Sequence, residues 1–169
     1  GGVRALGIRG CSVSMPFKEE VIPLVDTVEP SARAIHSVNT IVNEDGHLTA
    51  SNTDYTAVQR LIDEHGLDPG DAVLIRGSGG MASAVGVAFR DHGFHSGVVV
   101  ARNREAGSAL ADRLGYDYAF DVGDRTTPII VNVTPIGMAG GPEEREVAFV
   151  EATIAKAHTV FDVVALPSE

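Results

Sequence analysis

The sequence has one cysteine, few cations and no long apolar run, and each shortage excludes a class of protein. Cys11 has no second cysteine to pair with, so a disulfide framework is excluded and a reducing compartment is expected. Lys and Arg number 13 against 23 Asp and Glu, and the net charge of −10 argues against nucleic-acid binding, which needs clustered cations. No apolar run reaches the ~18 residues of a membrane span and no signal peptide is recognisable. We therefore expect a cytoplasmic protein with neither nucleic-acid nor membrane partners.

Three further observations limit the reading. The six histidines show no ligand spacing with Cys11 or with paired carboxylates, so no metal site is expected. The acidic run at residues 143–146 is typical of a solvated loop. Gly1-Gly2-Val3 is typical of the middle of an element, and the last residues directly follow an apolar run. We therefore expect a segment of a longer protein, truncated at both ends.

A turn-rich connector at residues 66–71 separates two periodic regions, so we expect domains at 1–67 and 68–169. In the first, the pattern predicts strands at 11–15 and 37–42 and a helix at 18–28 that Pro23 kinks or delays. Asp45-Gly46 predicts a tight turn into a strand at 48–50, hence a hairpin. A further helix is expected from Tyr55 onward, with its apolar face at Val58, Leu61 and Ile62 and Asp54 as its N-cap.

The second region alternates strands and helices in the manner of βαβ units. Strands are expected at 72–75, 98–101, 116–120, 129–133 and 160–164, with helices at 82–89 and up to Leu114. Continuous Val and Ile runs indicate strands buried on both faces of a parallel sheet. The fold class expected is α/β: a Rossmann-type parallel-sheet domain beside an incomplete α/β substrate domain.

A glycine-rich turn lies between the first predicted strand and helix of this region. Gly77-Ser78-Gly79-Gly80-Met81-Ala82 fits the Gly-x-Gly-x-x-Ala pattern in the strand–turn–helix context that dinucleotide binding requires. Gly77 would permit the turn, Gly79 would let the pyrophosphate approach the backbone, and Ala82 would let the helix pack closely. The helix N-terminus offers free N–H groups to the phosphates. The alternative is a flexible loop without a ligand, which the context makes less attractive.

The end of the next strand indicates which dinucleotide is bound. A site for NAD wants a carboxylate there, whereas Ala101-Arg102-Asn103-Arg104 offers two guanidinium groups. Arginine binds a 2′-phosphate with bidentate geometry, so NADP is favoured over NAD. The alternative is that both arginines are solvated surface groups.

Six motifs in one order resemble the shikimate dehydrogenase family. They are Gly10-Cys11-Ser12-Val13-Ser14-Met15-Pro16-Phe17-Lys18, Ser37-Val38-Asn39-Thr40, Ser51-Asn52-Thr53-Asp54, Gly77 to Ala82, Ala101-Arg102-Asn103 and Asn132-Val133-Thr134-Pro135-Ile136-Gly137-Met138. The divergent shikimate dehydrogenase-like branch matches best. The resemblance implies that Ser14, Lys18, Asn39 and Asp54 bind a cyclic hydroxy acid. It further implies that the cofactor contacts Gly77 to Ala82, Ala101, Arg102, Asn103, Thr134, Pro135, Ile136 and Val163.

The chain also departs from the family pattern. Ser12 and Ser14 replace Asn and Thr, and Ala165 stands where the family has a substrate-contacting tyrosine. The family's carboxylate-gripping Ser-x-Ser and a substrate-binding Gln would fall outside residues 1–169. The resemblance therefore implies fold, cofactor and reaction type more firmly than the substrate.

Lys18 and Asp54 make chemical sense as a catalytic pair. Ketone reduction needs a proton donor at the oxygen and alcohol oxidation needs a base there, and a lysine held by a carboxylate can do both. Taken alone, Lys18 would be a surface lysine and Asp54 a helix cap. The implied enzyme is an NADP-dependent dehydrogenase interconverting shikimate and 3-dehydroshikimate, or acting on quinate, in the cleft between its domains.

Two rivals stay open at this stage. One is a related two-domain dehydrogenase for another small alicyclic acid. The other is a ligand- or NADP-sensing module without turnover, which Ala165 favours and which retention of Lys18 and Asp54 opposes. A homodimer is possible, and the sequence does not decide it.

Overall fold

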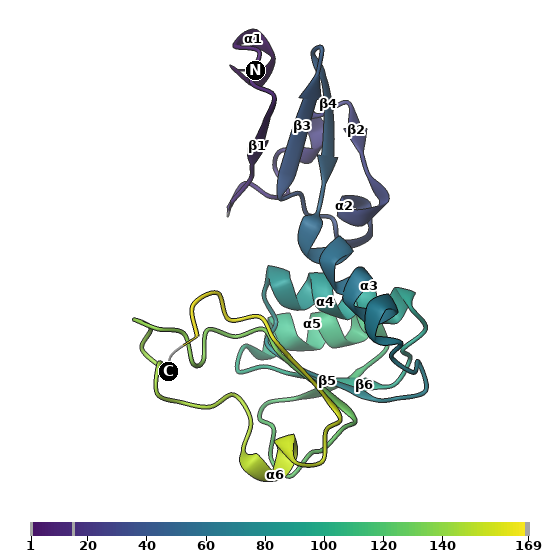
Figure 1. The fold of residues 1–169 in the computed structure, drawn as a ribbon, viewed down its shortest axis with the longest axis vertical. Helices are drawn as coiled ribbons and strands as arrows, with labels where there is room; N and C mark the ends of the chain where they lie inside the picture. The colour runs from purple at the N-terminus through teal and green to yellow at the C-terminus, as the bar shows by residue number, and fades with distance from the viewer. Residues whose placement is uncertain (1, 15, 168–169) are drawn as a thin grey trace. The chain divides into compact units, whose positions relative to one another are not determined.

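The computed structural model describes residues 2–14 and 16–167, which form two compact units, Gly1–Glu64 and His65–Glu169 (Figure 1). The division falls at the last residue of helix α3 (Thr53–His65), three residues before the domain boundary expected from the sequence. Each unit has its own sheet and its own buried residues. In the described part of the chain, no helix combines the length and the apolarity needed to cross a membrane.

The first unit is built on a four-stranded mixed sheet in the order β1-β3-β4-β2. The strands are β1 (Gly10–Ser12), β2 (Thr27–Val28), β3 (Thr40–Glu44) and β4 (His47–Ser51). The predicted hairpin is confirmed: β3 and β4 pair antiparallel across Asp45 and Gly46, whose φ angles of 53° and 91° suit a two-residue hairpin turn. The core beneath it consists of Ala32, Val38, Ile41, Leu48 and Ala50.

The helix predicted over residues 18–28 is wrong. Turns at 16–21 lead into a short 3-10 helix, η1 (Ile22–Leu24), and then into β2, which pairs parallel with β4. Pro23 lacks the N–H that a longer helix would need, and Val21 in the turn and Val25 in the extended chain both pack against the core. Two short helices escaped prediction, α1 (Gly2–Ala5) and α2 (Pro30–Ile35). The strand expected at 11–15 ends at Ser12, and Met15 lies outside the described residues.

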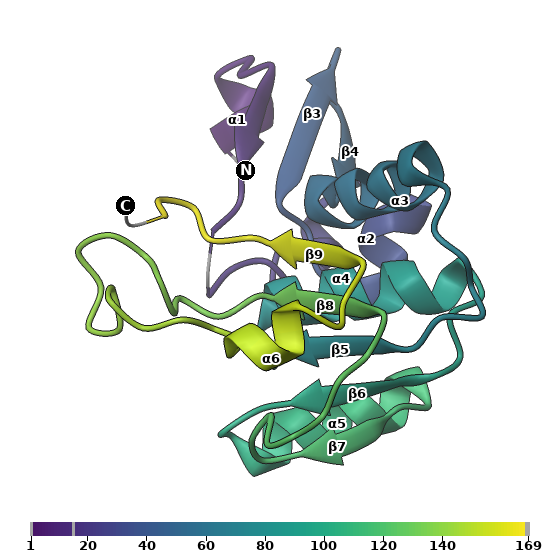
Figure 2. The same ribbon diagram turned by 60° about the horizontal axis from the view of Figure 1, so that its bottom comes forward.

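The second unit confirms the α/β class, with five parallel strands in the order β7-β6-β5-β8-β9 (Figure 2). They are β5 (Val73–Arg76), β6 (Gly97–Val100), β7 (Asp117–Ala119), β8 (Ile129–Asn132) and β9 (Thr159–Asp162). Helices α4 (Gly80–Asp91) and α5 (Arg104–Leu114) cover one face, and the segment around Phe149 and α6 (Glu151–Ile154) covers the other. Burial on both faces explains the continuous apolar runs, because the adjacent residues Leu74 and Ile75, whose side chains point to opposite faces, are both fully buried.

The strand order reverses beside β5. The chain runs outward from β5 through β6 to β7, then returns to the other side of β5 as β8 and β9. The carboxyl ends of β5 and β8 therefore diverge into loops that leave in opposite directions. In open parallel sheets, ligands bind at such a switch point.

Candidate functional site

A cavity of about 530 Å³ opens at this carboxyl edge of the parallel sheet. Nine of the thirteen residues expected to bind the cofactor line it: Gly77, Ser78, Gly79, Ala101, Arg102, Asn103, Thr134, Pro135 and Ile136. Gly80, Met81 and Ala82 form the first turn of α4 beside it. Val163 follows β9, is 37% exposed and does not line the cavity. Three separate sequence motifs thus meet at one edge of the sheet.

The first two glycines of the turn, Gly77 and Gly79, have different surroundings. Gly77 has a φ of 131°, and a Cβ there would lie 2.7 Å from Val133 Cγ2, so no other residue fits. At Gly79 a Cβ would meet no protein atom within 4 Å, and its φ of −84° suits any residue. Ala82 is fully buried, as close helix packing requires. Since the protein itself does not demand glycine at position 79, the open space there fits a ligand that approaches the backbone.

Asn132, at the end of β8, holds the loop that carries Thr134 and Ile136. It is 1% exposed, and its Oδ1 accepts hydrogen bonds from the Thr134 hydroxyl at 2.6 Å and the Thr134 N–H at 3.1 Å. Its Nδ2 donates to Asp162 Oδ1 at 3.2 Å, which ties β8 to β9. A buried amide with all these partners fixes the loop at the rim of the cavity.

Arg102 has a partner that the sequence did not reveal. Its Nη1 and Nη2 atoms donate to the two carboxylate oxygens of Glu143, each at 3.0 Å. This pairing raises the pKa of Arg102 above its ordinary value. The expectation of a solvated acidic loop is wrong for Glu143, whose side chain is only 19% exposed against 68% for Arg102. Arg76, at the end of β5, also lines the cavity, and burial lowers its pKa, with a further contribution from the charge of Arg102.

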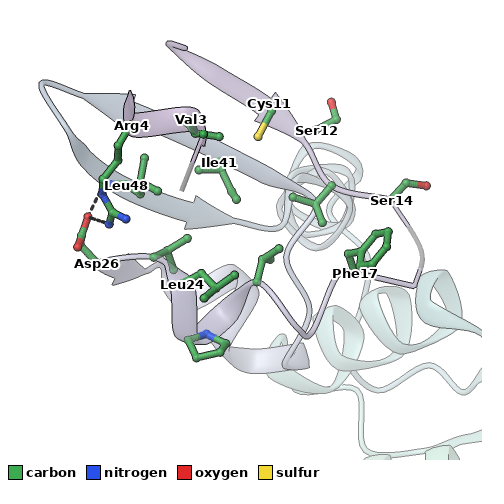
Figure 3. A pocket seen from close by; sticks show the side chains of 15 residues that line it. Val3, Arg4, Cys11, Ser12, Ser14, Phe17, Leu24, Asp26, Ile41 and Leu48 are labelled. Atoms are coloured by element: carbon green, nitrogen blue, oxygen red, sulfur yellow. Dashed lines mark hydrogen bonds and ion pairs between the residues drawn. The ribbon is translucent and has the colours of Figure 1, made fainter. Parts of the chain in front are cut away.

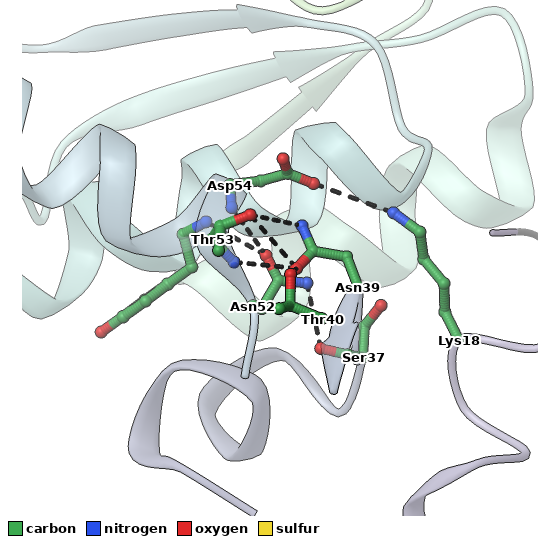
Figure 4. A network of polar contacts seen from close by, with 8 residues as sticks. Lys18, Ser37, Asn39, Thr40, Asn52, Thr53 and Asp54 are labelled. Atoms are coloured by element: carbon green, nitrogen blue, oxygen red, sulfur yellow. Dashed lines mark hydrogen bonds and ion pairs between the residues drawn. The ribbon is translucent and has the colours of Figure 1, made fainter. Parts of the chain in front are cut away.

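Lys18 and Asp54 come together in the first unit (Figure 4). Lys18 Nζ lies 3.8 Å from Asp54 Oδ2, which is an ion pair but too long for a hydrogen bond. The two side chains are 28% and 30% exposed. The carbonyl of Lys18 accepts from the N–H of Val38 at 2.8 Å, which fixes the lysine backbone beside the chain entering β3. The pair is a partly buried cation and anion that a small molecule in the solvent can still contact.

The start of α3 is organised by two asparagines. Asn52 is 1% exposed, and its Oδ1 accepts from the N–H groups of Asp54 and Tyr55 at 3.1 and 3.2 Å. The expectation that Asp54 caps this helix is therefore wrong, because Asn52 is the cap. Asp54 sits at the second helical position, where the helix dipole favours its carboxylate. The carboxylate is left free to face Lys18.

Asn39 is the second organiser of this region. Its Oδ1 accepts from the Thr53 N–H at 3.0 Å and the Thr40 hydroxyl at 2.9 Å, while its Nδ2 donates to the Thr53 hydroxyl at 3.0 Å. An amide has two N–H donors, and within the described residues only one of them is used. Asn39 therefore joins β3 to α3 and keeps one donor for a ligand.

Ser14, the remaining predicted substrate residue, is not joined to the Lys18–Asp54 pair by any hydrogen bond among the described residues. It is exposed and lines a different cavity, of about 730 Å³, in the same unit (Figure 3). That cavity is mainly apolar, with Ile41 and Leu48 among its lining residues. The Arg4–Asp26 ion pair closes one side at 2.6 Å. The structure thus brings Lys18, Asn39 and Asp54 to the start of α3, while the role predicted for Ser14 stays a prediction.

Sequence reasoning missed Asn52, Asn132 and Glu143 as organising residues. Asn52 could have been found, since Asn is as good a cap as Asp and precedes the helix directly. Glu143 had no local signal, because its partner lies 41 residues away. Among the described residues, no group of three or more His, Cys, Asp or Glu side chains is placed to hold a metal ion.

Comparison with known proteins adds sequence relatives along nearly the whole chain. Residues 1–41 match the family model described as the shikimate dehydrogenase substrate binding domain. A shikimate dehydrogenase-like protein of Haemophilus influenzae is 52% identical over 168 residues, covering 99% of this chain and 62% of that protein. A shikimate dehydrogenase (NADP(+)) of Moorella thermoacetica is 38% identical over 156 residues, covering 85% and 53%.

A solved structure agrees with these relatives. The quinate dehydrogenase of Corynebacterium glutamicum, in complex with NAD, superimposes with a TM-score of 0.84 at 31% identity. The match covers 96% of this chain and 61% of that one. The chain therefore spans between about half and two thirds of the length of the proteins it matches.

Proposed function

Because the chain belongs to the shikimate dehydrogenase family, we propose that it is part of an NADP-dependent oxidoreductase acting on a cyclic hydroxy acid. The proposed reaction interconverts shikimate and 3-dehydroshikimate, or the corresponding pair for a close relative such as quinate. The observation that carries the proposal is the Lys18–Asp54 ion pair at 3.8 Å. Two residues from separate motifs, each unremarkable alone, meet in the arrangement that carbonyl reduction needs.

The cavity of the second unit supports a nicotinamide dinucleotide as the cofactor. Gly79 and the first turn of α4 would hold the pyrophosphate. The helix N-terminus offers free N–H groups, and Gly79 has no Cβ to keep the phosphates from the backbone. Arg102 would face the 2′-phosphate, and Thr134 to Ile136 would line the nicotinamide side. When bound, this cofactor supplies or accepts a hydride. The absence of a carboxylate directly after β6 favours NADP over NAD.

The chain's own side chains handle the proton. Lys18, partly exposed beside a carboxylate, would give a proton to the substrate oxygen on reduction and remove it on oxidation. Asp54 would hold the ammonium in place and accept a hydrogen bond from a neighbouring substrate hydroxyl. The unused N–H of Asn39 would donate to a second hydroxyl. A substrate rich in hydroxyl groups matches this set of donors and acceptors.

One observation favours a second candidate, a ligand- or NADP-sensing module. Ala165 stands where the resemblance places a substrate-contacting tyrosine, and it is exposed. Loss of one substrate contact could end turnover while leaving ligand binding. A dehydrogenase for another small alicyclic acid would differ from the main proposal only in its substrate.

The test is Lys18→Ala in the full-length protein, with shikimate, quinate and related alcohols offered and NADPH followed by its absorbance. We expect kcat to fall about 10²- to 10⁴-fold, the usual effect of losing a proton-transfer group. Affinity for NADP should stay within about twofold, because its proposed contacts lie in the second unit. Asp54→Asn should also slow turnover, and the two effects should not add, since the residues act together.

Lys156→Ala is the matched control, because it removes an exposed lysine from the second unit and should change neither quantity. A raised KM with unchanged kcat in Lys18→Ala would make Lys18 a binding residue and leave the proton to Asp54. Turnover of none of the compounds, together with tight NADP binding, would favour the sensing module.

A further inference from the structure

The Arg102–Glu143 pair lies where the proposed site would distinguish NADP from NAD. Arg102 is the second residue after β6 and lines the cavity beside Gly77 and Gly79. Both of its terminal nitrogens already donate to one carboxylate, at 3.0 Å each. A phosphate monoester is recognised by the same planar group of donors. The Glu143 carboxylate and the 2′-phosphate of the proposed cofactor would thus both bind the guanidinium of Arg102.

The backbone of the loop holds Glu143 in place. Its carbonyl accepts hydrogen bonds from the N–H of Gly137 at 3.0 Å and of Glu146 at 3.1 Å. Gly137 and Gly140, with φ angles of 83° and 74°, allow the loop to turn sharply on its way to Glu143. The Glu143 side chain is largely buried while that of Arg102 is largely exposed. The carboxylate is therefore presented to the arginine by a hydrogen-bonded loop, and the arginine is the more exposed partner.

We propose that Glu143 determines dinucleotide specificity by competing with the 2′-phosphate of NADP for Arg102, which lowers the preference for NADP over NAD. The inference rests on the proposed function, since it assumes a dinucleotide in this cavity. Bound to Glu143, Arg102 presents a neutral pair in place of a free cation. A phosphate carrying about −1.5 to −2 charges must then displace the carboxylate or sit beside it, and both arrangements cost affinity. NAD carries no 2′-phosphate and meets no such competition.

The geometry favours competition over a supporting role. A guanidinium has five N–H groups, and a carboxylate that merely oriented Arg102 would leave the end-on pair, one N–H on each terminal nitrogen, free for that phosphate. Here these two nitrogens are the ones that bind Glu143. Arg76 also lines the cavity, but its guanidinium donates to the carbonyl of Ala148 and makes no hydrogen bond to Glu143 in the described structure.

The experiment is a titration of the chain with NADPH and with NADH, followed by nucleotide fluorescence, in four variants. Glu143→Gln keeps the shape of the side chain and removes its charge. We expect the ratio of affinities, NADPH over NADH, to rise about 3- to 10-fold, as suits a partly exposed bidentate pair. Glu143→Ala should raise it at least as far. In an Arg102→Ala background, Glu143→Gln should leave the ratio unchanged, because the contested cation is gone.

Glu146→Gln is the matched control. Its carboxylate lies in the same loop and acts on Arg102 through charge, but no hydrogen bond joins the two in the described structure. Its effect on the ratio should stay under about twofold. An unchanged or lowered ratio in Glu143→Gln, with NADH still bound, would overturn the inference and make Glu143 a support for Arg102. If the unmodified chain bound neither nucleotide, the proposed cofactor site would itself be wrong, and the inference with it.

Discussion

At the scale of single residues, Gly77 and Gly79 show how one motif contains two physical requirements. Gly77 must be glycine for the fold, because its φ is 131° and Val133 fills the space of a side chain. Gly79 has ordinary backbone angles and open space around it. Apart from the preference of an N-cap for glycine over alanine, no contact within the described chain requires glycine there. The sequence motif assigns the two positions these different roles, and the backbone angles and the space around each glycine agree with that assignment.

Substituting each glycine by alanine should therefore give opposite results. Gly77→Ala should lower the free energy of unfolding by about 1–3 kcal/mol, the usual cost of a strained backbone together with a steric clash. Gly79→Ala should lower it by about 1 kcal/mol or less, since only the helix cap changes. The second variant should nevertheless weaken NADPH binding at least about tenfold. Urea unfolding and fluorescence titration measure the two quantities, and full NADPH affinity in Gly79→Ala would place the pyrophosphate elsewhere.

The catalytic and cofactor residues differ in how far the sequence could predict them. Lys18 and Asp54 were predictable because each stands in a motif of fixed spacing, and the structure brings them to 3.8 Å. Their roles stay predictions. Glu143 could not be found, because its contact with Arg102 depends on the path of a loop and no local pattern encodes that path.

At the scale of elements, the sequence predicts best where local pattern and burial agree. The first three residues of β5 and of β8 are apolar and fully buried, so the continuous apolar runs were enough to predict both strands. The segment from Lys18 to Val28 is apolar at helical spacing, yet it folds as turns and a strand. Its backbone pairs with β4, through Asp26 N–H to the Leu48 carbonyl at 3.0 Å, and tertiary pairing outweighs a pattern that Pro23 already weakens.

The cap of α3 offers a test at this scale. Asn52 is 1% exposed. Asn52→Ala removes the acceptor for two helix N–H groups and the donor to the Ser37 carbonyl at 3.0 Å. We expect the free energy of unfolding to fall by about 2–3 kcal/mol, from a lost cap together with a partly buried Ser37 carbonyl that loses its donor. Asn52→Asp keeps the acceptor and should cost less. Equal losses in the two variants, measured by urea unfolding, would show that the cap contributes nothing.

At the scale of the whole molecule, stability against pH depends on every group whose proton affinity changes on folding. Burial raises the pKa of Tyr116 to about 12, from an ordinary value of 10.0, and its hydroxyl donates to the Phe94 carbonyl at 2.8 Å. A raised pKa means that the folded chain keeps a proton that the unfolded chain releases. The stabilisation is complete below pH 10 and is lost as pH rises from 10 toward 12.

Tyr116→Phe isolates this contribution, because it removes the titrating group and keeps the ring. Near pH 7 the variant should be about 1 kcal/mol less stable, since the Phe94 carbonyl loses its partner. Between pH 10 and 12 the unmodified chain should lose stability more steeply than the variant, by up to about 1.4 kcal/mol per pH unit. The difference in free energy of unfolding between the unmodified chain and Tyr116→Phe should therefore shrink as pH rises from 10 to 12. Urea unfolding at pH 7, 10 and 11.5 measures it, and parallel losses in both chains would show that Tyr116 keeps its proton no more tightly when folded than when unfolded.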